Sequence, residues 1–271
     1  MKVGRLALWA LAGLLVVAVV RVTVPRVGGA TILLLLIYLV YGLLIVGAVR
    51  ACRDAGIPIP EVIGPPPKIR DLITALLFIP LLLLVAMLSI WLTMYVLSWI
   101  APGFVRSLLA DRQGSSLVRN LVPGASFFLP LGIIVVGPVV EEFVFRGLLL
   151  RRWVARSGLW RGIFGTSLVF ALLHPQFVAG AFVIGIVLAL LYLATRSLPV
   201  PILVHGLMNG IVTLVAFNRD QLAMSADAQT RTLAQLQSEW GAPLIMLVVI
   251  SALLAAAARP LVIRITALQR S

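Results

Sequence analysis

Two adjacent glutamates are the first residues in this sequence that could do chemistry. Glu141 and Glu142 directly follow the apolar run 127–140 and precede Arg146. Ionisable side chains within apolar spans are costly to bury, and they are therefore candidates for function. On a helix, Glu142 and Arg146 lie four residues apart and can pair, whereas Glu141 points about 100° away from Glu142. The structural alternative, a packing pair of Glu142 with Arg146, leaves one carboxylate over.

The two histidines of the chain are a second such feature, because both lie inside apolar runs. His174 precedes Pro175, and a residue before proline is disfavoured in the helical conformation. The sequence therefore predicts that His174 lies at a helix end, where backbone groups and water are within reach. The alternative for each histidine is a satisfied hydrogen-bonding group with no further role.

The second histidine, His205, is accompanied by a side-chain amide. His205 and Asn209 are four residues apart, so a helix presents them on one face. Gly206 and Gly210 flank them, and small residues allow a second helix to approach closely. We therefore expect this helix to pack tightly against the part of the protein that uses His205 and Asn209.

Together these side chains supply the groups that hydrolyse a peptide bond without a serine or cysteine nucleophile. Such a reaction needs a base that deprotonates water, donors to the oxyanion, and a proton for the leaving amine. A buried carboxylate beside a histidine can activate water, because burial raises its basicity. We predict Glu141 with His174 as the activating pair, and His205 with Asn209 as the oxyanion donors.

The elements that must position these groups are membrane helices. Of the 271 residues, 62% are hydrophobic and 11% are charged, against about 45–50% and about 25% in soluble domains. The apolar residues form long runs, which is typical of membrane spans. We predict an all-α fold, a polytopic transmembrane helical bundle of about eight spans. The predicted spans are 6–24, 30–49, 72–100, 126–150, 162–174, 177–195, 200–217 and 243–258.

A proline-rich stretch divides the predicted bundle. Gly64 is followed by three prolines, which cannot continue a helix. We predict an N-terminal transmembrane hairpin over residues 1–63, a connector over 64–71, and a six-span core over 72–271. The run 6–24 lacks a following signal-peptide cleavage motif, so it is predicted to be a retained span. The polar stretch 218–239 is predicted to be an external loop with some helix.

The basic residues predict the orientation of the chain. The net charge is +13, but the 22 lysines and arginines lie in the breaks between apolar runs. This pattern favours the lipid bilayer as partner and excludes nucleic acid, which needs a basic soluble face. The positive-inside rule predicts that both termini lie in the cytoplasm. We expect the protein to be located in the cell membrane. Cys52 is the single cysteine, so it forms no intrachain disulfide, and we expect it to be functionally inert.

Three short motifs in this order resemble a known family. They are Glu141-Glu142-Phe-Val-Phe-Arg146, Phe170-x-x-x-His174 and His205-x-x-x-Asn209. The pattern is similar to that of the CPBP family, which contains type II CAAX prenyl endopeptidases and bacteriocin-processing and self-immunity membrane proteins. The resemblance covers residues 126–217, about a third of the chain, and uses both histidines.

The resemblance implies an all-α intramembrane protease with a cavity open toward the cytoplasmic side. Its expected substrate is a prenylated C-terminal CAAX-type peptide or another membrane-associated peptide. It implies that Glu141 and His174 activate water, and that His205 and Asn209 form the oxyanion side. Glu142 and Arg146 would orient the site, and Phe170 would pack beside it.

Other functions stay open at this point. No cofactor is expected, but Glu141, His174 and His205 would also suit a divalent metal such as zinc, although the zinc-protease motif HExxH is absent. A non-catalytic immunity or scaffold protein is an alternative, which the complete motif set argues against. A proton-coupled transporter is another, disfavoured because the two halves of the sequence show no repeat.

Overall fold

The computed structural model of the chain describes residues 15, 34–110, 125–217 and 233–270. Every element in these ranges is a helix, which confirms the predicted all-α membrane bundle. The protein is therefore a multi-pass membrane protein. Of the first predicted span, 6–24, only residue 15 is described.

The helices bear out part of the predicted span count. Four described helical segments are long and apolar enough to cross a membrane: Ile69–Ile100, Phe127–Ser157, Pro175–Thr195 and Gly241–Gln269. The segments Leu159–Leu172 and Pro199–Val215 are apolar but shorter. A count of eight spans is thus not confirmed. The short helices need protein neighbours to satisfy their ends, because a complete span takes about 20 residues.

The elements follow one another in a simple order. The α-helices are α3 Tyr41–Asp54, α4 Ile59–Ile63, α5 Ile69–Leu76, α6 Ile79–Ile100, α7 Pro102–Ala110, α9 Ala125–Leu131, α10 Gly137–Glu142, α11 Arg151–Ser157, α12 Leu159–Leu172, α13 Val178–Thr195, α14 Pro199–Phe217, α16 Leu233–Ser238 and α17 Gly241–Arg270. Three π-helical segments, η1 Leu36–Val40, η2 Gly132–Val136 and η3 Phe143–Leu150, and the 3₁₀ turn η4 Pro175–Phe177 join them.

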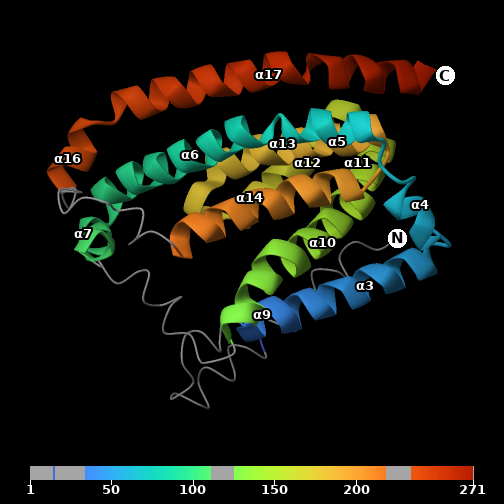
Figure 1. Cartoon of the computed structure of the whole chain (residues 1–271), viewed down its shortest axis with the longest axis horizontal. Coiled ribbons are helices and arrows are strands. Elements are labelled where there is room, and N and C mark those ends of the chain that lie inside the picture. The colour runs from blue at the N-terminus through green and yellow to red at the C-terminus, as the bar shows by residue number, and fades with distance from the viewer. Residues whose placement is uncertain (1–14, 16–33, 111–124, 218–232, 271) are drawn as a thin grey trace.

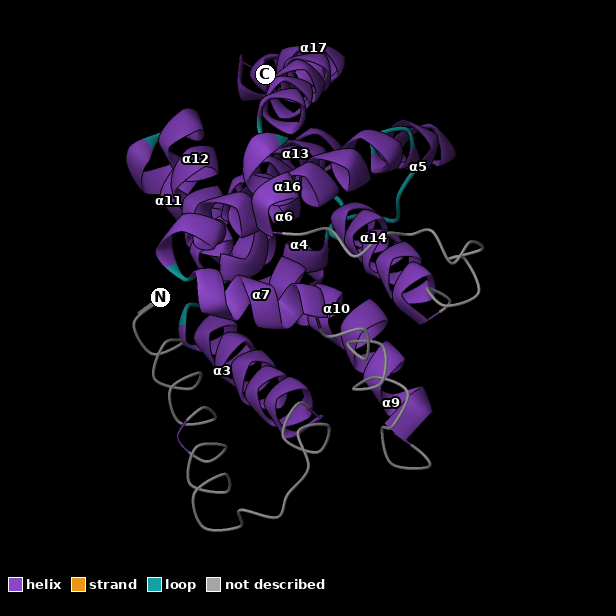
Figure 2. Ribbon diagram, turned by 90° about the vertical axis from the view of Figure 1, so that its left-hand side faces the viewer, coloured by secondary structure: helices purple, strands orange, loops and turns teal. Residues whose placement is uncertain are grey.

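Helix α13 forms the centre of the bundle. It packs against α6, α12, α14 and α17, and most of its side chains are buried. Figures 1 and 2 show α17 crossing the outer face of this group, while α3 and α9 lie on the opposite side. The apolar stretch of α17 is only 22% buried against protein, so most of its surface is available to lipid.

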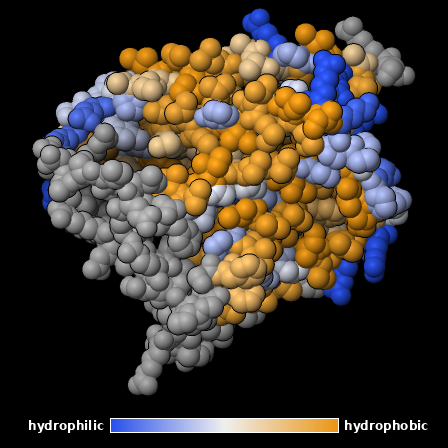
Figure 3. Space-filling model, viewed as in Figure 1, coloured by the Kyte–Doolittle hydropathy of each residue, from blue (hydrophilic) through white to orange (hydrophobic). Residues whose placement is uncertain are grey.

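The surface separates an apolar band from a hydrophilic end. Figure 3 shows a broad hydrophobic band over the bundle, with hydrophilic residues gathered at the right-hand edge. Figure 1 places α5 and the end of α17 at that edge. The α3–α5, α11–α12 and α13–α14 connections and the helix ends beside them carry basic residues that the sequence predicts to be cytoplasmic, among them Arg53, Lys68, Arg70, Arg156, Arg161 and Arg196. We refer to this end of the molecule as the basic end.

The last helix is longer than the sequence predicted. The span was expected to stop at residue 258, before Arg259 and Pro260, but α17 continues through Pro260 to Arg270. A proline inside a helix removes one backbone hydrogen bond without always ending the helix. Of the predicted loop 218–239, residues 218–232 lie outside the description and α16 supplies the expected helical part.

The start of the proline-rich connector packs against the α13–α14 turn. The Leu198 amide donates to the Ile63 carbonyl at 2.8 Å. Gly64 has φ +76°, and a Cβ atom there would lie 1.8 Å from the Arg196 carbonyl oxygen. Only glycine fits this position, because it has no Cβ and tolerates positive φ. The division of the chain at residues 64–71 stays a prediction.

Candidate active site

The helix that carries the two glutamates is irregular on either side of them. In η2 the Gly137 amide bonds to the Gly132 carbonyl. Pro138 follows and has no N–H to donate to the Ile133 carbonyl, five residues earlier. That carbonyl accepts instead from the side-chain amide of Asn209 on α14, at 3.0 Å. The proline thus leaves an acceptor that fixes Asn209.

Helix α14 approaches this irregular segment closely at one glycine. A Cβ atom at Gly206 would lie 2.8 Å from the Ile134 carbonyl oxygen, whereas one at Gly210 would lie 3.7 Å from the Ile134 side chain. The first distance is a clash with backbone and the second is an ordinary contact. The close approach expected from the sequence is therefore found at Gly206, one residue after His205.

Glu142 is buried, and its carboxylate contacts both Arg146 and His205. Its side chain is fully buried. Arg146 Nη1 donates to Glu142 Oε1 at 2.8 Å, which is the pair that the four-residue spacing predicts. His205 Nδ1 lies 2.8 Å from the same oxygen, and Arg146 Nη2 donates to the Gly185 carbonyl of α13 at 3.2 Å. Glu142 and Arg146 therefore tie the glutamate helix to both α13 and α14.

Glu141 faces the other side and meets both histidines. Its Oε2 lies 3.8 Å from His174 Nε2 and 3.9 Å from His205 Nε2. Its Oε1 accepts a hydrogen bond from the Tyr41 hydroxyl of α3. Oε2 is buried and has no hydrogen-bond partner among the described residues. The separations from the histidines are too long for direct hydrogen bonds.

His174 lies at a helix end, as Pro175 predicts. Helix α12 ends at Leu172, and His174 has the non-helical angles φ −119° and ψ 62°. Its Nδ1 lies 2.8 Å from the Phe170 carbonyl oxygen. A carbonyl can only accept, so Nδ1 carries the proton, and in the neutral ring Nε2 presents a lone pair toward Glu141.

The Phe170 ring packs among the polar groups of the site. Its centroid lies 4.4 Å from that of His174 and 5.9 Å from that of His205. The Arg146 guanidinium lies 4.8 Å from the same centroid, on the scale of a cation–π contact. Phe170 therefore holds both imidazoles and the arginine in place with an apolar surface, beside the site as expected.

These groups line one cavity of about 310 Å³. Its polar lining consists of Tyr41, Glu141, His174, Gln176, His205, Asn209 and Thr213, and its remaining wall is apolar. The four residues predicted to be catalytic are thus brought together from three helical segments, and the three predicted to support them lie around this group. A carboxylate, two imidazoles and an amide face one small space.

One residue of the site was not predicted. Tyr41 comes from α3, outside the region 126–217 that contains the three motifs. The available signal was a phenol within the apolar stretch 30–49, since a polar group in a span needs a partner. Nothing in local spacing relates it to Glu141, which lies 100 residues away.

The described residues do not form a metal-ligand shell. No group of three or more His, Cys, Asp and Glu side chains among them is arranged to hold a metal ion. Excess chelator in a peptide-cleavage assay tests whether a metal takes part. Cys52 lies beyond the predicted span 30–49, and burial raises the pKa of its thiol, an effect that Arg151 opposes more weakly. A buried, protonated thiol is a poor ligand and nucleophile.

Comparison with known proteins finds similar proteins for this region. Residues 123–211 match the model of the Rce1-like type II CAAX prenyl endopeptidases. The chain is 32% identical over 106 residues to the membrane-embedded CAAX protease MroQ of Staphylococcus aureus (strain USA300), covering 36% of this chain and 41% of that protein. It is 28% identical over 112 residues to an uncharacterized 24.3 kDa protein of Escherichia coli, covering 39% of this chain and 48% of that protein.

These matches have a limited extent. The chain spans less than half the length of either curated relative. No solved structure matches the chain. The matched region nevertheless contains all three motifs and both histidines. Over residues 123–211, the chain is similar to the Rce1-like type II CAAX prenyl endopeptidases, in agreement with the resemblance to the CPBP family that its motifs indicate.

Proposed function

We propose that this protein is an intramembrane endopeptidase in which Glu141 and His174 activate the attacking water. The observation that carries the proposal is the unpartnered Glu141 Oε2, which faces the Nε2 atoms of His174 and His205 at 3.8 and 3.9 Å. A water bonded to Oε2 and to one Nε2 fits at the usual length of about 2.8 Å from each. The family match supports membrane proteolysis in general.

The reaction follows from the donors and acceptors of the site. Glu141 Oε2 takes one proton from water while His174 Nε2 accepts its other hydrogen and orients it. The hydroxide attacks the scissile carbonyl carbon, and the carbonyl oxygen becomes the oxyanion. When the C–N bond breaks, the protonated Glu141 returns its proton to the leaving amine. The products are one carboxylic acid and one amine, and Glu141 is again a carboxylate.

The oxyanion meets donors on α14. Asn209 uses one amide hydrogen on the Ile133 carbonyl and keeps the second for the substrate. His205 donates from Nδ1 to Glu142, so a protonated ring also donates from Nε2. A charged donor is also the stronger one for an oxyanion.

Tyr41 acts on the base as a positioning residue. Its hydroxyl occupies Oε1 of Glu141, which leaves Oε2 as the atom that meets water. A bond from a fixed phenol limits the rotation of the carboxylate, and such alignment of a base is a large part of catalytic efficiency.

The test is cleavage of a fluorogenic farnesylated CAAX peptide by purified protein in detergent. Glu141→Gln keeps the shape of the side chain but removes the base, so kcat/KM is expected to fall by at least about 100-fold. Glu61→Gln is the matched control, because Glu61 is an exposed carboxylate outside the cavity. Equal activity in Glu141→Gln and wild type would overturn the mechanism.

Two further arms separate the remaining alternatives. The same peptide without its farnesyl group asks whether a prenyl chain is required for recognition. Excess chelator asks whether a metal acts: activity should persist, and loss that a divalent ion reverses would place a metal beside Glu141 and the histidines. A folded wild type that cleaves neither peptide would favour another substrate or a non-catalytic role.

A further inference from the structure

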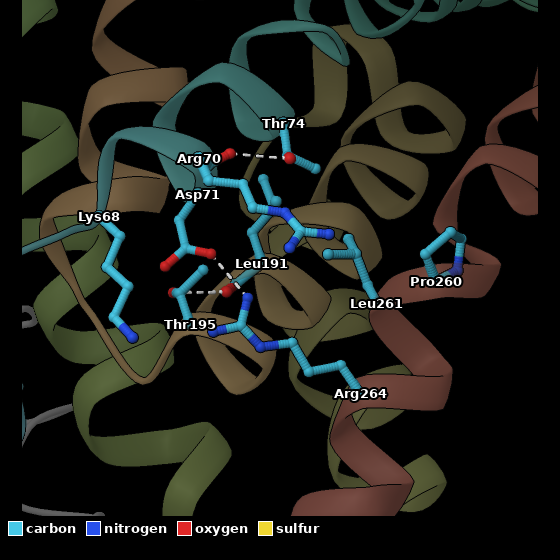
Figure 4. Close-up of a pocket in the computed structure, with 9 residues that line it drawn as sticks. All are labelled: Lys68, Arg70, Asp71, Thr74, Leu191, Thr195, Pro260, Leu261 and Arg264. Carbon is cyan, nitrogen blue, oxygen red and sulfur yellow. Dashed lines mark hydrogen bonds and ion pairs between the residues drawn. The ribbon is translucent and has the colours of Figure 1, made fainter.

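A second cavity of about 340 Å³ lies at the basic end, away from the proposed active site. Figure 4 shows that it is bounded by the start of α5, the end of α13 and the last third of α17. Its lining residues are Lys68, Arg70, Asp71, Thr74, Leu191, Thr195, Pro260, Leu261 and Arg264. None of them lines the cavity that contains Glu141.

The rim of this cavity carries a surplus of positive charge. Three cations, Lys68, Arg70 and Arg264, stand against one carboxylate, Asp71. Arg264 Nη1 donates to Asp71 Oδ1 at 2.6 Å, and the Asp71 side chain is buried while that of Arg264 is 43% exposed. Asp71 therefore fixes the direction of Arg264 and leaves its remaining donors at the opening. Lys68 and Arg70 are exposed and have no ion-pair partner among the described residues.

The walls around this rim are apolar. Leu191, Pro260 and Leu261 line the cavity, and Leu191 and Leu261 are buried. Helix α5 buries Asp71 and Ala75 but exposes Ile69 and Ile73, at 72% and 55%. An amphipathic helix with basic residues beside exposed apolar ones suits the interface between headgroups and acyl chains. The apolar surface of α17 continues this contact region toward the membrane interior.

We propose that this cavity binds the phosphate of an anionic phospholipid headgroup. Lys68, Arg70 and the free donors of Arg264 would surround the phosphate oxygens, since guanidinium groups match phosphate geometry. The acyl chains would follow the exposed apolar residues of α5 and α17. Basic pockets between membrane helices on the cytoplasmic side bind such headgroups, and a volume near 340 Å³ is within the range of small-ligand sites.

The lipid is favoured over a soluble phosphate by what surrounds the cations. A site for a soluble anion needs only the charged groups, whereas this one joins three cations to apolar surface on both flanking helices. A phospholipid and a soluble phosphate both offer a phosphate group, but only the phospholipid also contacts the apolar surface. The experiment therefore tests both kinds of ligand.

Binding is measured by native mass spectrometry and by thermal unfolding of the full-length protein in neutral detergent. Phosphatidylglycerol should bind and raise the Tm, and phosphatidylcholine should do so far less. Lys68→Ala combined with Arg70→Ala should weaken phosphatidylglycerol binding by roughly 25-fold, at about fivefold for each basic residue. Both side chains are exposed, so the variant should keep its fold.

The matched control is Arg156→Ala combined with Arg161→Ala. Both arginines are exposed and lie at the same end, but neither lines the cavity. This control should bind phosphatidylglycerol as the wild type does. Equal losses in the two double variants would overturn the site in favour of general charge attraction. Equal stabilisation by glycerol 3-phosphate or inorganic phosphate would overturn the lipid as the ligand.

Discussion

At the scale of residues, the hydrogen bonds that each polar side chain of the site makes within the protein determine which of its atoms remain available to water or substrate. His174 and His205 each use Nδ1 on an acceptor within the protein, which directs both Nε2 atoms to Glu141. Asn209 likewise uses one hydrogen on Ile133 and keeps one. Second partners of this kind fix ring orientation and tautomer in catalytic sites. The side chains of His174, His205 and Asn209 are therefore held in fixed orientations by hydrogen bonds within the protein.

The role of Tyr41 gives the first prediction at this scale. Tyr41→Phe removes the hydrogen bond to Glu141 and leaves the ring in place. A hydrogen bond to a charged group is worth about 1.5–3 kcal/mol, so kcat should fall by roughly 10- to 100-fold. Because the base rather than the substrate loses its partner, KM should stay nearly unchanged.

A neighbouring tyrosine provides the control. The Tyr38 hydroxyl donates to the Phe128 carbonyl at 2.6 Å and does not reach the glutamates. Tyr38→Phe therefore removes a comparable phenol from the adjoining segment η1 without touching Glu141. A fall in kcat of equal size in both variants would argue that Tyr41 only supports the fold.

At the scale of elements, the motifs predicted which helices meet but not how they are held. Proline predicted the helix end at His174, and four-residue spacing predicted the Glu142–Arg146 pair. Both features depend only on residues within about one helical turn of each other in the sequence. The bond from Asn209 to Ile133 joins helices 76 residues apart, and such a contact leaves no trace in local periodicity.

The glycine contact between α14 and η2 carries the prediction at this scale. Gly206→Ala would press a methyl group onto the Ile134 carbonyl, with 2.8 Å available. Overpacking of this kind typically costs about 1–3 kcal/mol. The helix must move away, and His205 and Asn209 move with it. We expect a lower Tm together with a loss of peptide cleavage.

Gly210→Ala is the matched test, because its methyl group would make an ordinary contact at 3.7 Å. It should keep both the Tm and the activity close to those of the wild type. If the two alanine variants behave alike, the close approach at Gly206 does not position the site. The comparison is internal to one helix, so differences in helix propensity cancel.

At the scale of the whole molecule, two expectations from the sequence point to opposite ends. The positive-inside rule makes the basic end cytoplasmic, while the family resemblance implies a cavity open to the cytoplasm. The cavity extends from Glu141 toward Gln176 in η4 and Thr213 near the end of α14. Both lie at helix ends remote from the basic turns, so the two expectations conflict and one of them is wrong for this protein.

Labelling in intact cells decides the orientation. In a Cys52→Ala background, Arg156→Cys would report the basic end and Arg106→Cys the opposite end, where Figure 1 shows α7. If the basic residues set the topology, an impermeant maleimide should modify position 106 only, and position 156 should react only after lysis. The active-site cavity would then face the outside, and its substrates would be peptides that have crossed the membrane. Labelling of position 156 alone would reverse this, put the cavity toward the cytoplasm, and make prenylated or other cytoplasmic C-termini the substrates to test first.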